Sequence, residues 1–346
     1  MNPEAMMPTP APKTFTDAAE TMVACRRPVL LTHERPDGDA YGALTAMRAL
    51  LRGQGVDATA IVLEPLPDRY AVFQRYPPIS VLGRDVETSD LRDVDGVIVV
   101  DTCSYSQLGP MAAWVRDTDV PKVAIDHHCT RDELADVYVI DETAAAACLI
   151  VYDLARAVHW PIERDAAEAM FIGIATDTGW FRHANTDARA LAAAAELARQ
   201  GAHVNQLYDR LYLSDSVARV RLLGAALASL ELLCDRRLAV MTLPADRIAD
   251  TGASIADTED IINEPMRIGR VVVAVLLIDQ GDGVIRASLR SKPPWREDAV
   301  DVDVAAVASA LGGGGHARAA GVRLRGPWTQ ARDTVINAVR DVLERS

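Results

Sequence analysis

The hydrophobic positions in the first part of the chain form short unbroken runs that stop at a charged or ionisable residue. These runs cover residues 28–33, 96–101 and 122–126 and end at His33, Asp101 and Asp126. Unbroken apolar runs of this length are typical of parallel strands buried on both faces. Because open α/β folds bind ligands at the carboxyl ends of such strands, we expect these end residues to lie along one edge of a sheet.

Helical periodicity alternates with these runs, and a further strand is predicted at residues 57–63. The helix that ends at Gly53 begins just after the first strand, and an Ala-rich helix ends near Asp177. The predicted helical segments are residues 40–53, 144–158, 164–176, 188–200, 204–213 and 214–234. The alternation predicts an α/β domain with a parallel sheet.

The pattern changes after Arg237, where strands follow one another before any helix. Strands are predicted at residues 238–244, 270–280 and 283–291, and helices at 302–311 and 328–345. The turn Gly281-Asp282-Gly283 joins the last two strands as a hairpin. We therefore predict a disordered Pro-rich tail at 1–14, an N-terminal catalytic domain at 15–213, a helical linker at 214–235, and a smaller α/β domain at 236–346.

Acidic and imidazole side chains gather at the predicted strand and helix ends. The segments are THERPDGDAYG with His33, Asp37 and Asp39, GVIVVDT with Asp101, VAIDHH with Asp126, His127 and His128, and GIATDTG with Asp177. Carboxylate and imidazole ligands suit Mn²⁺ or Mg²⁺, and the absence of paired cysteines argues against a structural zinc site. Taken singly, Asp37 is most simply a turn residue and Asp101 a cap or turn acceptor, so the interpretation depends on their joint occurrence.

These four segments, in this order, resemble the four motifs of the DHH phosphoesterase family. The segment GGGGHARAAG, residues 312–321, resembles the signature of the DHH-associated C-terminal domain. The two-domain length is similar to that of the NrnA-like oligoribonucleases and pAp phosphatases, whereas RecJ-like nucleases are longer and type II pyrophosphatases lack the glycine-rich segment. The resemblance implies a DHH catalytic domain, a DHH-associated substrate-binding domain, and an active site in the cleft between them.

The resemblance also implies roles for the acidic and imidazole residues. Two divalent cations are expected, with Mn²⁺ favoured over Mg²⁺. The first ion would be held by His33, Asp37 and Asp101. The second would be held by Asp39, Asp101, His127 and Asp177. His128 would then contact the scissile phosphate, and Asp126 would orient an imidazole ring through its N–H.

The glycine run of the C-terminal segment predicts a substrate-binding role. Glycines lack a Cβ atom, so the backbone can approach a phosphate and offer its N–H groups. The predicted substrate-binding residues are Arg290, Ser291, Gly313, Gly314, Gly315 and His316. In isolation such a run is more simply a flexible turn. Trp295 is a candidate for stacking on a base, although packing on its own domain is the commoner role.

The function implied by the resemblance is hydrolysis of short oligoribonucleotides or of 3′-phosphoadenosine 5′-phosphate (pAp) through a metal-activated water. One alternative is a cyclic dinucleotide phosphodiesterase of the same fold, because the motifs do not distinguish linear from cyclic diesters. Another is a catalytically silent nucleotide sensor. The presence of every expected ligand disfavours the sensor.

The composition of the chain limits its candidate binding partners and its expected location. The net charge of −13 disfavours binding of long duplex nucleic acid, whereas short single-stranded RNA and small nucleotides remain candidates. The five cysteines show no CxxC spacing and are interpreted as reduced thiols of a cytoplasmic protein. No apolar run reaches the roughly 20 residues of a membrane span. A homodimer is compatible with the sequence.

Overall fold

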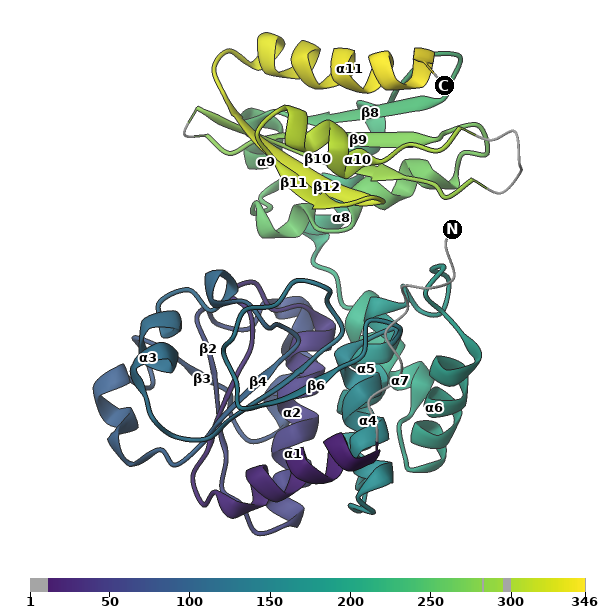
Figure 1. Ribbon diagram of the computed structural model, residues 1–346. Coiled ribbons are helices and arrows are strands. Elements are labelled where there is room, and N and C mark those ends of the chain that lie inside the picture. The colour runs from purple at the N-terminus through teal and green to yellow at the C-terminus, as the bar shows by residue number, and fades with distance from the viewer. Residues whose placement is uncertain (1–11, 282, 295–299, 346) are drawn as a thin grey trace. The chain divides into compact units, whose positions relative to one another are not determined.

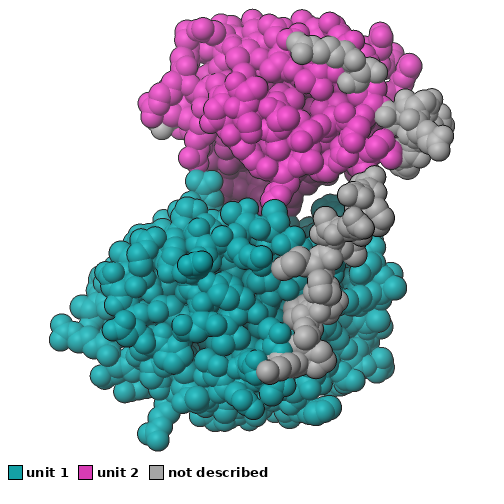
Figure 2. All heavy atoms as spheres, viewed as in Figure 1, with its two compact units in different colours: residues 1–214 teal, residues 215–346 magenta. Residues whose placement is uncertain are grey.

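The computed structural model describes residues 12–281, 283–294 and 300–345 (Figure 1). The chain forms two compact units, residues 1–214 and 215–346, which Figure 2 shows in different colours. Each unit contains its own six-stranded sheet and its own hydrophobic clusters. The predicted parallel-sheet domain followed by a smaller α/β domain is confirmed. Among the described residues no helix is long and apolar enough to cross a membrane.

The sheet of the first unit is parallel throughout. Its strands are β1 (Val29–Leu31), β2 (Thr59–Val62), β3 (Ser80–Val81), β4 (Val97–Val100), β5 (Lys122–Asp126) and β6 (Val137–Ile140). They lie in the order β3-β2-β1-β4-β5-β6. The order therefore reverses between β1 and β4, and in open α/β sheets such a reversal opens a crevice at the carboxyl ends of the two strands.

Helices cover both faces of this sheet. They are α1 (Pro12–Ala24), α2 (Gly38–Gly53), α3 (Met111–Asp117), α4 (Ala147–Ala157), α5 (Arg164–Asp177), α6 (Ala188–Arg199) and α7 (Val204–Tyr212), with short 3₁₀ segments at Asp68–Arg75, Thr88–Asp93 and Tyr105–Gln107. Side chains alternate between the faces, so Leu30 packs with α2 and α4 while Leu31 packs with α3. Both faces are apolar, which explains why the strands appear in the sequence as unbroken hydrophobic runs.

Two glycines allow α2, α4 and α5 to approach one another closely. A Cβ added to Gly42 of α2 would lie 2.7 Å from the Ala169 carbonyl oxygen of α5. A Cβ added to Gly173 of α5 would collide with the thiol of Cys148 in α4 and lie 2.6 Å from a carboxylate oxygen of Asp39. The three helix ends that surround Asp39 are thus packed without space for another methyl group.

The second unit has a mixed sheet in the order β11-β12-β10-β9-β8-β7, in which only β8 and β9 are parallel. Its elements are α8 (Val217–Ala228), β7 (Glu231–Leu233), β8 (Leu238–Leu243), α9 (Ala245–Thr251), β9 (Val273–Asp279), β10 (Val284–Ser291), α10 (Val304–Ala310), β11 (Gly314–His316), β12 (Ala319–Arg325) and α11 (Trp328–Arg345), with 3₁₀ segments at Ala256–Thr258 and Ile261–Arg267. One face packs against α10 and α11, and the other against α8 and α9 (Figure 1).

Several element boundaries differ from the sequence prediction. Helix α1 begins at Pro12, because proline is well tolerated in the first turn, so residues 12–14 of the predicted tail are helical. Residues 1–11 of that tail, Asp282 of the predicted hairpin turn, and Trp295 lie outside the described residues. The helix predicted at 214–234 ends at Ala228 and is followed by β7, which pairs with β8.

Five strands were not predicted: β3, β6, β7, β11 and β12. Strand β6 is only half-buried at its start, which weakens its hydrophobic pattern. Strands β11 and β12 form an antiparallel pair at the glycine-rich segment, which the sequence analysis did not assign to a strand. Glycines have low strand preference, so this pairing depends on the neighbouring strand β10 and leaves no local signal.

Candidate active site

The predicted site residues of the first unit gather at the carboxyl ends of its strands, beside the reversal in strand order. His33 follows β1 and Asp101 follows β4 directly. Asp126 is the last residue of β5, and His127 and His128 come next. Segments almost a hundred residues apart therefore meet because β1, β4 and β5 are adjacent in the sheet.

Asp37 and Asp39 enter the site from the start of α2. The Asp37 carboxylate caps this helix by accepting hydrogen bonds from the N–H groups of Asp39 (2.9 Å) and Ala40 (3.1 Å). Its capping role agrees with its position in a Pro-Asp-Gly sequence. The same carboxylate lies within 4.8 Å of ligand atoms of His33 and Asp101, so capping leaves it close to the cluster.

Asp39 is buried and faces the first turn of α4. Its carboxylate accepts hydrogen bonds from the N–H groups of Ala147 (2.6 Å) and Cys148 (3.0 Å). The N-cap residue of α4 is Ala146, whose side chain cannot accept these bonds. Asp39 therefore supplies from α2 the acceptor that an N-cap side chain normally provides.

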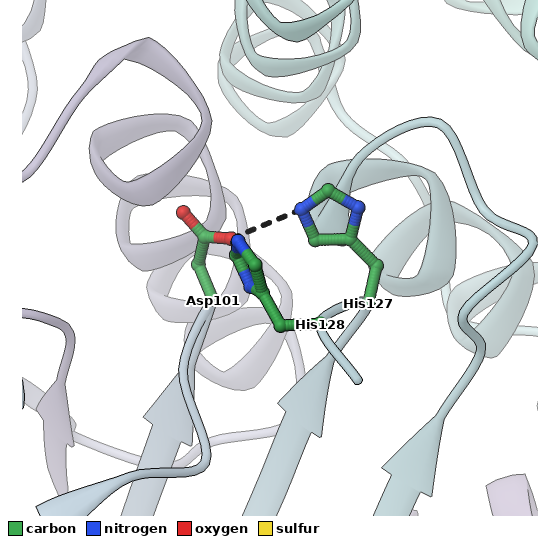
Figure 3. A group of neighbouring side chains, drawn as sticks. All are labelled: Asp101, His127 and His128. Atoms are coloured by element: carbon green, nitrogen blue, oxygen red, sulfur yellow. Dashed lines mark ion pairs between the residues drawn. The ribbon is translucent and has the colours of Figure 1, made fainter. Parts of the chain in front are cut away.

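Asp101 lies at the centre of the cluster and is 3% exposed. One carboxylate oxygen is 3.4 Å from His33 Nε2, and the other is 3.5 Å from His127 Nε2 and 3.8 Å from His128 Nδ1. Figure 3 shows the rings of His127 and His128 beside this carboxylate. The backbone φ of 60° at Asp101 is unusual for a non-glycine residue and turns the chain sharply where β4 ends. A strained conformation at this position indicates a functional constraint.

The carboxylate and imidazole atoms fall into overlapping groups. His33, Asp37 and Asp101 form one group, in which the ligand atoms all lie within 4.8 Å of one another. Two further groups meet the same limit: Asp39, His127 and Asp177, and Asp101, His127 and His128. His127 Nε2 is 3.8 Å from Asp177 Oδ2, and its Nδ1 atom is 3.2 Å from the Ala144 carbonyl oxygen. That carbonyl accepts the Nδ1 proton and leaves Nε2 facing the carboxylates.

His128 and Asp126 form a separate pair beside this cluster. The Nδ1 atom of His128 lies 2.8 Å from Asp126 Oδ1. The same oxygen accepts the backbone N–H groups of His127 (2.8 Å) and His128 (3.2 Å). Asp126 is fully buried, so it holds both the backbone and the ring of His128 in a fixed orientation.

The electrostatics of the cluster favour cations. Burial raises the pKa of Asp177 to about 7, with Asp37 and Asp101 acting in the same direction and His127 opposing them. Burial also raises the pKa of Asp39, as do Asp101 and Asp177. Burial opposes ionisation of Asp101, but His127 and His33 lower its pKa to about 2. Carboxylates packed this closely repel one another unless positive charge lies between them.

The donor set fits a divalent metal. The buried Oδ1 atom of Asp101 has no hydrogen-bond partner among the described residues, although a buried carboxylate oxygen is costly to leave unsatisfied. Burial lowers the pKa of His127, but Asp101, Asp39 and Asp177 overcome this effect and raise it to about 10. The same carboxylates that attract a proton to His127 would attract a metal ion. Oxygen and imidazole ligands suit Mn²⁺ or Mg²⁺.

The two candidate residues on β10 of the second unit, Arg290 and Ser291, differ in burial and in hydrogen bonding. Arg290 is half-buried and forms no ion pair within the part of the chain that the structure describes. Burial lowers its pKa, and Asp260 opposes this effect. Ser291 is buried, and its hydroxyl donates to the carbonyl oxygens of Val302 (2.7 Å) and Ala317 (3.3 Å). The Ser291 hydroxyl thus stabilises the second unit internally, whereas Nη1 of Arg290 donates to the Leu289 carbonyl oxygen (3.2 Å).

The glycine-rich segment forms the edge strand β11. A Cβ on Gly313 would collide with the Gly321 carbonyl oxygen, and one on Gly315 would lie 2.5 Å from the Ala319 carbonyl oxygen. Gly315 also has a φ of 142°, which only glycine adopts readily. Gly314 and His316 are exposed. Two of the glycines are therefore required by packing against β12, and Gly314 presents bare backbone at the sheet edge.

The site residues predicted from the sequence did not include residues 144–148 or Asn185. The helix predicted from Ala144 starts at Ala147, and residues 144–146 form a connection whose backbone contacts His127 and Asn185. Alanines carry no polar side chain, so only backbone groups make these contacts. The run of small residues at 144–147 is the one sequence signal for such a close approach.

These features define a class of protein. The segments that resemble the DHH phosphoesterase motifs lie together at the carboxyl edge of a parallel sheet. They are beside the point where the strand order reverses. The DHH family, N-terminal domain, matches residues 28–174, and the DHHA1 domain matches residues 237–345. The chain belongs to the DHH family, which confirms the prediction from the motifs.

Its relatives include bifunctional oligoribonuclease and PAP phosphatases NrnA. The protein of this name from Thermus thermophilus is 31% identical over 338 residues, which cover 95% of this chain and 94% of the relative. The one from Bacillus subtilis is 26% identical over 310 residues, covering 88% and 90%. A probable manganese-dependent inorganic pyrophosphatase from Streptococcus thermophilus is 29% identical over 168 residues, which cover 48% of this chain and 53% of that protein.

A solved structure has the same fold over almost the whole chain. An exopolyphosphatase-related protein from Bacteroides fragilis superposes with a TM-score of 0.88 at 22% identity, covering 99% of this chain and 98% of that one. At this identity the similarity establishes the fold.

Proposed function

We propose that the protein is a metal-dependent phosphoesterase that hydrolyses short oligoribonucleotides and pAp. The observation that carries the proposal is the set of overlapping carboxylate and imidazole groups centred on Asp101 at the sheet edge. The relatives named as oligoribonuclease and PAP phosphatase, which align over nearly the whole chain, support this choice of substrates. We further propose that the protein acts in the cytoplasm, in keeping with cysteines that are all free thiols.

We propose that the first unit holds two divalent cations, with Mn²⁺ preferred. One would bind His33, Asp37 and Asp101, and the other Asp39, Asp101, His127 and Asp177. When bound, such ions lower the pKa of a water and neutralise charge on the transferring phosphoryl group. The manganese-dependent pyrophosphatase among the relatives supports the choice of metal.

His128 is proposed to act on the phosphate and not as a metal ligand. Its Nδ1 atom lies 2.8 Å from Asp126 Oδ1, which fixes the orientation of the ring. The side chain of His128 is 35% exposed, compared with 15% for His127, so it is the more accessible of the two rings. With a proton on each nitrogen, His128 would donate a hydrogen bond to the scissile phosphate and protonate the leaving oxygen. Asp126 would orient the ring and stabilise its charged form.

We propose that the second unit binds the nucleotide. Arg290 offers a guanidinium without an ion pair among the described residues, which can bind a phosphate in a bidentate manner. Gly314 and His316 on the exposed edge strand β11 would lie against the nucleotide, with Gly313 and Gly315 shaping the strand. Ser291 is assigned a structural role instead, because its hydroxyl is already bonded within the unit.

A substrate panel tests the proposal. Purified protein with added Mn²⁺ is assayed on pAp, a dinucleotide, a five-nucleotide RNA and cyclic di-AMP, and each assay is repeated with a chelator. We expect release of phosphate from pAp, cleavage of both RNAs, and loss of each activity without metal. Hydrolysis of cyclic di-AMP alone would favour the cyclic dinucleotide phosphodiesterase. Binding of Mn²⁺ and nucleotides with no turnover would favour the sensor.

A further inference from the structure

The chain leaves α5 through a left-handed turn that contains two bulky residues. Gly179, Trp180 and Phe181 have φ values of 56°, 58° and 63°. Large side chains avoid this region, so the turn persists only because other contacts stabilise it. The ring centroids of Trp180 and Phe181 each lie 5.9 Å from that of Phe171, and Trp180 also contacts Tyr208 at 5.1 Å. Aromatic packing thus holds a strained turn directly after Asp177.

The turn brings the following residues back toward the end of α5. The backbone N–H groups of Arg182 and His183 both donate to the Thr178 carbonyl oxygen at 2.9 Å. Two residues further on, the Nδ2 atom of Asn185 donates to the carbonyl oxygens of Asp177 (3.3 Å) and Ala145 (3.1 Å). Both acceptors are carbonyls, so the amide of Asn185 must present its NH₂ group to them.

Each carbonyl belongs to a segment that holds part of the cluster around Asp101. The first is the backbone of Asp177 itself. The second lies in residues 144–148, where the Ala144 carbonyl contacts the His127 ring and the first two N–H groups of α4 bond the Asp39 carboxylate. Asn185 therefore connects the two pieces of backbone that orient Asp39, His127 and Asp177. These three form one of the groups close enough to share an ion.

Residues 144–146 are buried, and their backbone makes two hydrogen bonds to neighbouring backbone: the Ala144 N–H donates to the Asp141 carbonyl oxygen (3.0 Å), and the Ala146 carbonyl oxygen accepts from the Leu149 N–H (3.1 Å). Within the described residues, the side chains that bond their backbone are the His127 ring and Asn185. Arg189 acts further along, on Asp141, where the connection begins. Removal of the Asn185 amide would take away the side-chain hydrogen bond to the Ala145 carbonyl, next to the Ala144 carbonyl that contacts the His127 ring.

We propose that Asn185 is a positioning residue for the metal ion bound by Asp39, His127 and Asp177. It does not touch the ion and acts by fixing two backbone segments relative to each other. The inference rests on the proposed metal site and adds a residue outside the motifs that suggested it.

The test compares Mn²⁺ binding by Asn185→Ala, Asn185→Leu and the unaltered protein. Electron paramagnetic resonance of free Mn²⁺ measures binding without relying on activity. The leucine keeps the branched shape of asparagine and removes its N–H donors, so it separates hydrogen bonding from packing. Asn205→Ala, at an exposed position on α7 with no hydrogen bond or ion pair among the described residues, is the matched control. We expect both Asn185 variants to bind the ion at Asp39, His127 and Asp177 about 10-fold less tightly, and the control to bind normally.

Two further readouts distinguish positioning from general stability. The melting temperature of the metal-free protein should be the same in all four proteins, because Asn185 is exposed. Turnover by the Asn185 variants should recover at saturating Mn²⁺. Unchanged Mn²⁺ affinity in both variants, or a reduced affinity that merely accompanies a lower metal-free melting temperature, would overturn the inference. Failure of the unaltered protein to bind Mn²⁺ would instead overturn the proposed metal site.

Discussion

The carboxylate of Asp101 has the most contacts with other ionisable groups in the cluster. It faces His33 on one side and His127 and His128 on the other, and one of its buried oxygens has no hydrogen-bond partner among the described residues. A residue in this position can serve two ions at once. Its loss would therefore alter both halves of the cluster, unlike loss of any single outer ligand.

The first prediction concerns Asp101→Asn. We expect turnover of pAp at saturating Mn²⁺ to fall about 1,000-fold, or about 4 kcal/mol in barrier height, because both proposed ions would lose a charged ligand. The measurement is steady-state phosphate release. Asp119→Asn, which changes an exposed carboxylate in the loop before β5, is the control and should be fully active. Near-normal turnover by Asp101→Asn in folded protein would rule out the bridging role.

A second residue-scale prediction concerns Asp141, which is fully buried between β6 and α4. Burial raises its pKa, but hydrogen bonds from Thr143 and Arg189 outweigh this and lower the pKa overall. A carboxyl with a lowered folded-state pKa stabilises the fold above its unfolded pKa of about 3.9 and loses that effect as the pH falls through the folded value. Asp141→Asn should thus destabilise the protein by about 1–3 kcal/mol at pH 7.

The measurement is urea denaturation of both proteins at a series of pH values. We expect the difference in free energy of unfolding to be constant from neutral pH to about pH 5 and to shrink below about pH 4. Asp119→Asn should show no difference at any pH. A difference for Asp141→Asn that persists unchanged at pH 2 would show that the charge of Asp141 is not what stabilises the connection.

At the scale of elements, the site depends on how closely α2, α4 and α5 pack. Asp39 begins on α2, bonds the first turn of α4, and lies against Gly173 of α5. The position of one candidate ligand is therefore set by three helices. The parallel strands β1, β4 and β5, which are followed by His33, Asp101 and His127, form the frame for part of the cluster.

The element-scale prediction is that Gly173→Ala harms both stability and metal binding. The added methyl would collide with Cys148 and displace the Asp39 carboxylate, so we expect a loss of about 1–3 kcal/mol in unfolding free energy. Mn²⁺ affinity should fall as well. Gly53→Ala, at the open end of α2 with no atom within 4 Å of the added Cβ, should cost nothing in either measurement. Full stability and normal Mn²⁺ binding by Gly173→Ala would show that the helices can move apart easily.

The sequence predicted the buried strands and the polar residues at their ends, but it did not predict the contacts that depend on backbone groups. Strands β1, β4 and β5 are buried on both faces, so their hydrophobic runs identify them and the polar residues that follow. The pairs in contact, such as Asp126 with His128, are close in sequence or at strand ends, where a sheet edge brings them together. The contacts of Asp39 with α4 and of Asn185 with Ala145 depend on backbone N–H and carbonyl groups. Every residue type has these groups, so no residue pattern reveals such contacts.

At the scale of the whole molecule, the candidate metal ligands and the candidate substrate residues belong to different units. All of the ligands lie in residues 1–214, and Arg290 and the glycine-rich segment lie in residues 215–346. Each unit has separate hydrophobic clusters, so a substitution in one need not disturb the core of the other. Metal binding and substrate binding should therefore be separable by mutation.

The whole-molecule prediction tests this separation with Arg290→Gln. Loss of a charge-assisted hydrogen bond to phosphate should raise the KM for pAp at least about 10-fold, because such bonds contribute about 1.5–3 kcal/mol. Mn²⁺ affinity should stay unchanged. Arg325→Gln, which removes the same charge from an exposed position on β12, is the control. A normal KM for Arg290→Gln, or a loss of Mn²⁺ affinity, would contradict the division of roles.

The bond between Asp39 and the start of α4 has a practical consequence for spectroscopy. The amide protons of Ala147 and Cys148 are donated to the same carboxylate that is proposed to face an ion. Any withdrawal of electron density from that carboxylate would weaken both bonds and shift the two proton resonances. Nuclear magnetic resonance of these two amides would then report occupancy of the centre directly, even for diamagnetic Mg²⁺ and without any substrate present.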